Sequence, residues 1–125
     1  MWWLPQLGEP LPRGAEAVGV HHKLETYSLV KDHDDGEHKA YVFEQALCIT
    51  LGEVDHLAEE IMRGLATKPV TKLEMTPWGL SCRVQVPVRG VGIHHGRVVP
   101  VMTGWELRYV GDRPRLVTAY IKKRR

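Results

Sequence analysis

The spacing of the hydrophobic residues changes once along the chain, at Pro69. Before this point apolar residues recur at the interval of an amphipathic helix, and after it they alternate with polar residues as in a strand. This order predicts an α+β domain in which three N-terminal helices pack on one face of a roughly four-stranded antiparallel sheet. The clearest helical stripe consists of Val54, Leu57, Ala58, Ile61, Met62 and Leu65.

The three helices are expected at about residues 22–31, 37–47 and 54–65. A turn at Asp34-Asp35-Gly36 separates the first two. Thr50 and Glu53 precede the third with the spacing of a capping box, in which each side chain accepts a hydrogen bond from an exposed N–H of the other residue's backbone. The third helix is therefore the best-defined element of the pattern.

The four strands are expected around residues 73–75, 80–88, 99–109 and 116–121, and the short connections make neighbours antiparallel. Simple alternation in the last strand places Leu116, Thr118 and Tyr120 on one face. Pro87 and Pro100 lack the N–H that a ladder needs, which predicts a sheet edge or a bulge at each.

The remaining segments lie at the two ends. Residues 1–20 are rich in proline and glycine, which predicts an extended arm that packs through Trp2, Trp3 and Leu4 on the body or on a second subunit. A single domain is expected over 21–121, followed by a basic tail over 122–125. The apolar arm and the long strands also make a homodimer an expected partner state.

Composition excludes several classes of protein but does not identify a binding partner. The net charge of +2 is too small to indicate a ligand. The two cysteines occupy apolar positions, so we expect no disulfide framework and a reducing compartment, the cytoplasm. No apolar stretch reaches the ~20 residues of a membrane helix, so no membrane association is expected. No dinucleotide, Walker or nucleophile-elbow motif is present.

Polar residues at the start of the second helix and on the sheet suggest chemistry on a phosphate. His38 and Lys39 fall in a first helical turn, where exposed N–H groups favour an anion. Imidazole can act as acid or base near neutral pH. Arg83 can add positive charge, and Tyr120 can donate a proton or stack on a base. Thr118 and Arg115 come from the same strand as Tyr120. These residues predict RNA cleavage without a metal or another cofactor.

Two other interpretations stay open. A non-catalytic RNA- or protein-binding module would use the Trp2-Trp3 arm and the basic tail over 122–125. A metal-dependent hydrolase would use His33, Asp35 and His38, which are drawn from an unusually large set of seven histidines. Each candidate residue also has a structural explanation, as a solvated helix position or a strand former.

Four motifs resemble those of an uncharacterised family of small bacterial domains: Lys23-Leu24-x-x-Tyr27, Gly36-x-x-Lys39-Ala40-x-x-Phe43, Thr103-x-Trp105 and Pro114-Arg115-Leu116-Val117-Thr118-Ala119-Tyr120. The resemblance extends from about Leu11 to Ile121. Genes of that family often stand beside a small partner gene, as in toxin–antitoxin pairs.

Helices before a sheet that ends in Leu-Val-Thr-Ala-Tyr are also similar to the barnase–EndoU–colicin–RelE group of metal-independent ribonucleases. The resemblance implies a ribonuclease toxin, an RNA substrate and a small antitoxin or immunity protein. It implies catalytic roles for Lys39, Thr118 and Tyr120 and RNA contacts for Lys23 and Trp105. His38 is outside the resembling pattern.

Overall fold

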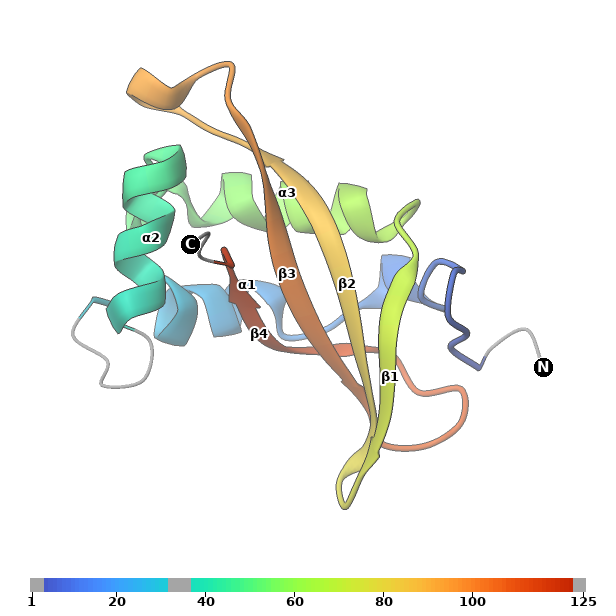
Figure 1. Ribbon diagram of the computed structural model, residues 1–125. Helices are drawn as coiled ribbons and strands as arrows, with labels where there is room; N and C mark the ends of the chain where they lie inside the picture. Colours follow the sequence, from blue (N-terminus) through green and yellow to red (C-terminus); the bar gives the residue numbers. More distant parts are fainter. Residues whose placement is uncertain (1–3, 32–36, 123–125) are drawn as a thin grey trace.

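The computed structural model describes residues 4–31 and 37–122, without the side chains of residues 37 and 38. The predicted fold class is confirmed: helices precede a four-stranded antiparallel sheet with strand order β1-β2-β3-β4 (Figure 1). The helices are α1 (Val20–Lys23), α2 (Glu37–Leu47) and α3 (Val54–Leu65). The strands are β1 (Val70–Thr76), β2 (Gly79–Arg89), β3 (Val98–Leu107) and β4 (Arg115–Tyr120). Short helical turns are η1 (Gly14–Glu16), η2 (Leu24–Ser28), η3 (Leu51–Glu53) and η4 (Gly92–His94).

Helix α3 forms as its sequence predicts. Thr50 N–H donates to Glu53 Oε1 at 2.9 Å, so the capping box is present, and the single turn η3 leads into the helix. The buried side chains of Leu57, Ile61 and Leu65 face the sheet. A Cβ atom added to Gly64 would lie 2.6 Å from Val86 Cβ, so glycine lets α3 approach β2 closely.

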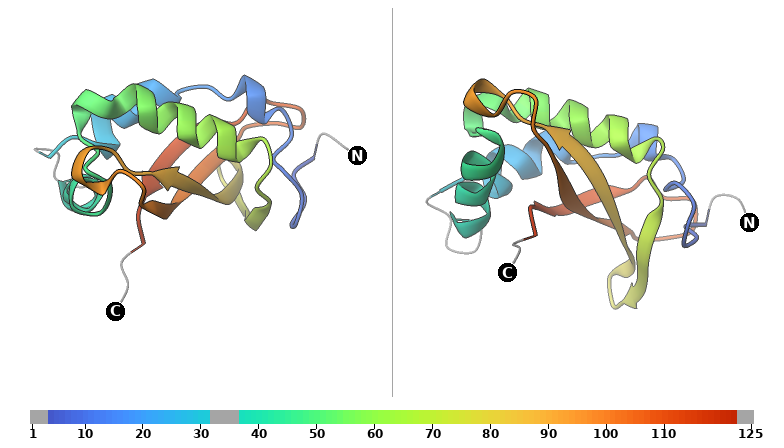
Figure 2. Two further views of the ribbon diagram at one scale, coloured as in Figure 1. Left: turned by 90° about the horizontal axis from the view of Figure 1, so that it is seen from above. Right: turned by 45° about the horizontal axis from the view of Figure 1, so that its top comes forward.

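The other two helices differ in how well their bounds were predicted. Helix α2 has the expected bounds and buries Phe43 and Leu47. The first helix begins two residues earlier than expected and continues into η2, a π-helical turn in which Leu29 N–H donates to Leu24 O. Helices α1 and α3 lie on one side of the sheet, and α2 stands at its end (Figure 2). The opposite face of the sheet is not covered by a described helix.

A β-bulge in β4 corrects the predicted facing of its side chains. Trp105 pairs with Leu116 and Gly104 pairs with Thr118, so Val117 is an extra residue in the ladder. Leu116 is consequently buried in the core with the helices, whereas Thr118 and Tyr120 are partly exposed on the opposite face. One inserted residue moves the later side chains to the other face because the strand repeat is two.

The two strand prolines lie opposite each other, as Pro87 and Pro100 pair in the β2–β3 ladder. Strand β1 pairs with β2 only as far as Val84, and β4 begins to pair with β3 at Met102. Each proline is therefore on an edge that no described strand covers, which confirms the prediction of sheet edges.

The described part of the N-terminal arm packs on the body. Single bridges join Leu7 to Val70 and Val18 to Arg115, and Leu11 is buried. Trp2 and Trp3 lie outside the described residues, as do residues 123–125 of the basic tail. Within the described ranges, no helix combines the length and the apolar character needed to cross a bilayer.

Candidate functional site

Lys39 reaches from the first turn of α2 onto the face of β4 that points away from the helices α1 and α3. Its Nζ donates to Thr118 Oγ1 at 3.4 Å and lies 5.1 Å from the centre of the Tyr120 ring. Thr118 and Tyr120 occupy this face because of the bulge at Val117. Three residues that the sequence proposed for one site are thus in contact, although Lys39 is 79 positions from Thr118 in the chain.

Arg83 joins the same group from β2, across the intervening strand β3. Its Nη1 donates to the Tyr120 hydroxyl oxygen at 3.2 Å, and its guanidinium lies 5.9 Å from the centre of the Tyr120 ring. The residue between them on β3 is Gly104, which pairs with Arg83 on one side and Thr118 on the other. A Cβ at Gly104 would lie 2.7 Å from Thr118 Cγ2. The missing side chain therefore leaves the space through which Arg83 reaches Tyr120.

Tyr27, from η2, connects two of the cations. The ammonium groups of Lys23 and Lys39 lie 5.3 and 5.7 Å from the centre of its ring. Both distances are within the range of a cation–π interaction. The sequence pointed to Lys23 through the family resemblance but did not propose Tyr27 for the site. The i, i+4 spacing of Lys23 and Tyr27 is the signal that could have found it, because it places both residues on one side of a helix.

We refer to these six partly exposed residues as the Lys39 cluster: Lys23, Tyr27, Lys39, Arg83, Thr118 and Tyr120. Among the described residues, no carboxylate lies within ion-pair distance of its three cations. By contrast, Lys31, which follows η2 in the chain, forms an ion pair with Glu44. Cations that no described carboxylate pairs, and that lie beside aromatic rings, favour a ligand that carries both negative charge and a planar group.

A family model described as Domain of unknown function (DUF6883) matches residues 11–123. The chain belongs to this family. The match includes every residue of the Lys39 cluster and leaves out the first ten residues of the chain. Comparison of the DUF6883 chain with curated proteins and with solved structures finds no match in either set.

Two residues proposed from the sequence, Trp105 and Arg115, are not in the cluster of this DUF6883 domain. Trp105 is fully buried, and its indole N–H donates to Thr103 Oγ1 at 2.7 Å. This burial corrects the expectation that Trp105 contacts RNA, because a core side chain cannot stack on a base. Arg115 is exposed at the opposite end of β4 from Tyr120. The side chain of His38 lies outside the described residues.

The metal ligands proposed from the sequence lie mostly outside the described part of the domain. His33, Asp34 and Asp35 lie outside the described residues, as does the side chain of His38. Elsewhere in the described ranges, no group of three side chains from His, Cys, Asp and Glu is arranged to hold a metal ion.

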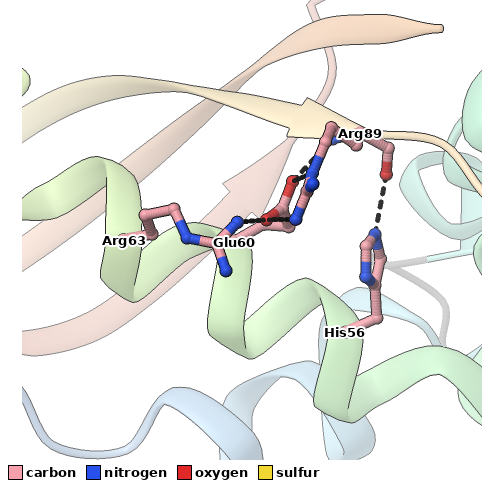
Figure 3. A network of polar contacts seen from close by, with 4 residues as sticks. All are labelled: His56, Glu60, Arg63 and Arg89. Carbon is pink, nitrogen blue, oxygen red and sulfur yellow. Dashed lines mark hydrogen bonds and ion pairs between the residues drawn. The ribbon is translucent and has the colours of Figure 1, made fainter. Parts of the chain in front are cut away.

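A second polar network lies on the helix-covered side, around the buried carboxylate of Glu60 (Figure 3). Arg89 donates to it from its backbone N–H at 2.9 Å and from Nε at 3.0 Å, and Arg63 donates from Nη1 at 2.7 Å. Burial alone would raise the pKa of Glu60, but the hydrogen bonds and charges of Arg89 and Arg63 outweigh it, so the pKa is lowered. His56 adds a contact of 2.7 Å between Nε2 and Arg89 O. The carboxylate of Glu60 is thus paired with both arginines, and the network fastens α3 to the free edge of β2.

Proposed function

We propose that the chain is a metal-independent endoribonuclease of the toxin type, held inactive by a small inhibitor protein, and that the Lys39 cluster is its active site. One observation carries the proposal. Lys39, Arg83 and Tyr120 come from α2, β2 and β4, and their functional groups converge on one exposed face. The family resemblance to toxin–antitoxin pairs supports the toxin role.

Cleavage of RNA without a metal uses the substrate's own 2′-hydroxyl as the nucleophile. The 2′-oxygen loses its proton to a base and bonds to phosphorus while the bond from phosphorus to the 5′-oxygen breaks. The leaving 5′-oxygen takes a proton from an acid, and the products are a 2′,3′-cyclic phosphate and a 5′-hydroxyl. The protein must supply the base, the acid and positive charge for the crowded phosphate.

The cluster can supply the charge and the acid. Lys39 and Arg83 flank the space over Tyr120 and can hold the phosphate oxygens. Because Arg83 donates to the Tyr120 oxygen, the phenol keeps its own O–H for donation to the leaving oxygen. Arg83 then stabilises the negative charge left on the phenol. Thr118 and the ring of Tyr27 position Lys39 through a hydrogen bond and a cation–π contact.

The general base of the reaction is assigned from the sequence. His38 precedes Lys39 in the first turn of α2, and it is the residue that we expect to take the proton from the 2′-hydroxyl. Replacement of His38 by alanine should then reduce cleavage without weakening the binding of an uncleavable 2′-deoxy oligonucleotide.

The decisive experiment is cleavage of total RNA by the purified protein in EDTA, with end-group analysis of the products. Wild type should leave 2′,3′-cyclic phosphates. Lys39→Ala and Tyr120→Phe should each lower the rate by about 10²-fold. Tyr120→Phe keeps the ring and removes only the hydroxyl. Lys72→Ala is the matched control, because Lys72 is an exposed lysine of the sheet beside Glu74 and its variant should cleave as wild type does.

The results also separate the enzyme from a non-catalytic RNA-binding module. If the wild type leaves RNA intact but binds it in a way that depends on Lys39, the enzyme hypothesis would be wrong and the binding module would be favoured. Full activity of Tyr120→Phe would remove the assigned acid. For the toxin role, induction of the wild type in a bacterial host should stop growth and induction of Lys39→Ala should not; a harmless, active wild type would contradict that role.

A further inference from the structure

An open groove of about 720 Å³ adjoins the Lys39 cluster on the same face of the sheet. Its lining residues come from α2, β2, β3 and the segment that follows β4. The lining residues that matter for its chemistry are Val42, Gln45, Gln85, Arg97, Met102 and Lys122.

The strands lead from the cluster directly into this groove. On β2, Gln85 follows Arg83 by two residues, so both side chains point to the same face about 7 Å apart. On β3, Met102 precedes Gly104 by the same step and pairs with Tyr120 of β4. The floor of the groove therefore continues the floor of the cluster without a change of face.

Helix α2 and the segment after β4 also extend from the cluster to the groove. Val42 lies one helical turn beyond Lys39 on α2, and Lys122 follows Tyr120 by two residues. The elements α2, β2 and β3 thus contribute to both the cluster and the groove, and the segment that follows β4 extends in the same direction. A polymer bound at the cluster would pass into the groove.

The groove differs from the cluster in chemistry. Gln45 and Gln85 are exposed side-chain amides, and each can donate and accept hydrogen bonds. Met102 adds apolar surface beside them. Arg97 stands at the far end, where its Nη1 donates to Ala46 O at 3.1 Å. None of the described lining residues is acidic.

We propose that this groove is the subsite for the nucleotide next to the cleaved bond of single-stranded RNA. The inference rests on the proposed function. Gln45 and Gln85 bind the edge of the base, Met102 contacts its face, and Arg97 with Lys122 holds the following phosphate. A paired base would not offer its Watson–Crick edge, so the substrate is single-stranded. The volume is within the range of about 300–1,000 Å³ found for small-molecule sites.

The test uses single-stranded oligonucleotides that differ only at the nucleotide beside the cleavage site. Cleavage is measured as kcat/KM, and affinity is measured on 2′-deoxy versions that cannot be cleaved. Wild type should prefer one base at that position by about ten-fold or more. Gln45→Ala and Gln85→Ala should reduce that preference, and Arg97→Ala should weaken all sequences alike. Gln6→Ala, an exposed glutamine on the arm, is the matched control.

The outcomes separate this inference from the proposed function. Cleavage by the wild type with a base preference that neither glutamine variant changes would overturn the subsite and leave the nuclease standing. A wild type that cleaves nothing, but binds the 2′-deoxy oligonucleotides with a preference that depends on Gln45 and Gln85, would support the subsite and overturn the nuclease. Equal binding of all oligonucleotides by the wild type would also overturn the subsite.

Discussion

The substitution Gly104→Ala tests how tightly the Lys39 cluster is built. The new methyl group would lie 2.7 Å from Thr118 Cγ2, well inside the ~3.5–4.0 Å at which two carbon atoms attract. Thr118 must then rotate, which removes its hydroxyl from Lys39, or β3 and β4 must separate. Either response disturbs the site without a change to any of its functional groups.

The size of the effect on stability follows from two opposing terms. Overpacking at a tight contact costs about 1–3 kcal/mol. Loss of the freedom of glycine in the unfolded chain returns about 0.4–1 kcal/mol. The balance for Gly104→Ala is a loss of roughly 1 kcal/mol of unfolding free energy, or about 4 °C in Tm for a chain of this size. Cleavage should fall by roughly 10- to 100-fold, because Lys39 loses its position.

The assay combines thermal unfolding, followed by circular dichroism, with RNA cleavage. Thr118→Ser supplies the rescue, because it removes the Cγ2 methyl group and keeps the hydroxyl that contacts Lys39. The double variant should therefore recover most of the stability and activity. Gly52→Ala is the control, since its nearest neighbour, Thr50 Oγ1, would be at an ordinary 3.8 Å.

Two results would refute this reasoning. Gly104→Ala could match the wild type in both Tm and cleavage, which would mean that the glycine is not needed. Alternatively, the double variant with Thr118→Ser could be no better than Gly104→Ala alone, and the methyl contact would then not be the cause.

Three further predictions concern the body of the fold. The lowered pKa of Glu60 stabilises the folded state fully above the ordinary carboxyl pKa of 4.5, and this stability is lost as the pH falls toward the lower folded value. Glu60→Gln should therefore lose less unfolding free energy than the wild type between about pH 5 and pH 3, and parallel urea-unfolding curves would contradict this. Gly64→Ala should lower the unfolding free energy by about 1–2 kcal/mol, since the contact with Val86 outweighs the helix propensity of alanine; a rise in Tm would exclude it. Burial raises the pKa of the Cys82 thiol to about 11, so iodoacetamide at mildly alkaline pH should modify the partly exposed Cys48 and spare Cys82; mass spectrometry of the intact protein would show a doubly modified product if the core were open.

The sequence predicted the elements well where one physical rule decides the local structure. Capping at Thr50 and the stripe along α3 fix the third helix, and alternation fixes the extent of β2. It failed at β4, where pairing with β3 inserts Val117 as a bulge. A bulge depends on how two strands match each other, and the alternation within a single strand does not record it.

The candidate site was predicted in part for the same reason. Lys39, Thr118 and Tyr120 were named from their positions at a helix start and on a strand, and they are in contact. Trp105 was misplaced because a motif does not tell whether a tryptophan is buried. Gly104 was missed because its contribution is an absence of atoms, which becomes visible only when its neighbours are known.

The facing prolines of β2 and β3 limit how copies of this chain can join by their sheets. Arg89, two residues after Pro87, directs its N–H outward to Glu60, so the proline nitrogen points to the same edge and offers no hydrogen there. Pro100 does the same on the other side. An incoming strand would lack a donor at the middle of either stretch, so fibre-like growth through this half of the sheet is disfavoured, and a dimer would have to use a different surface.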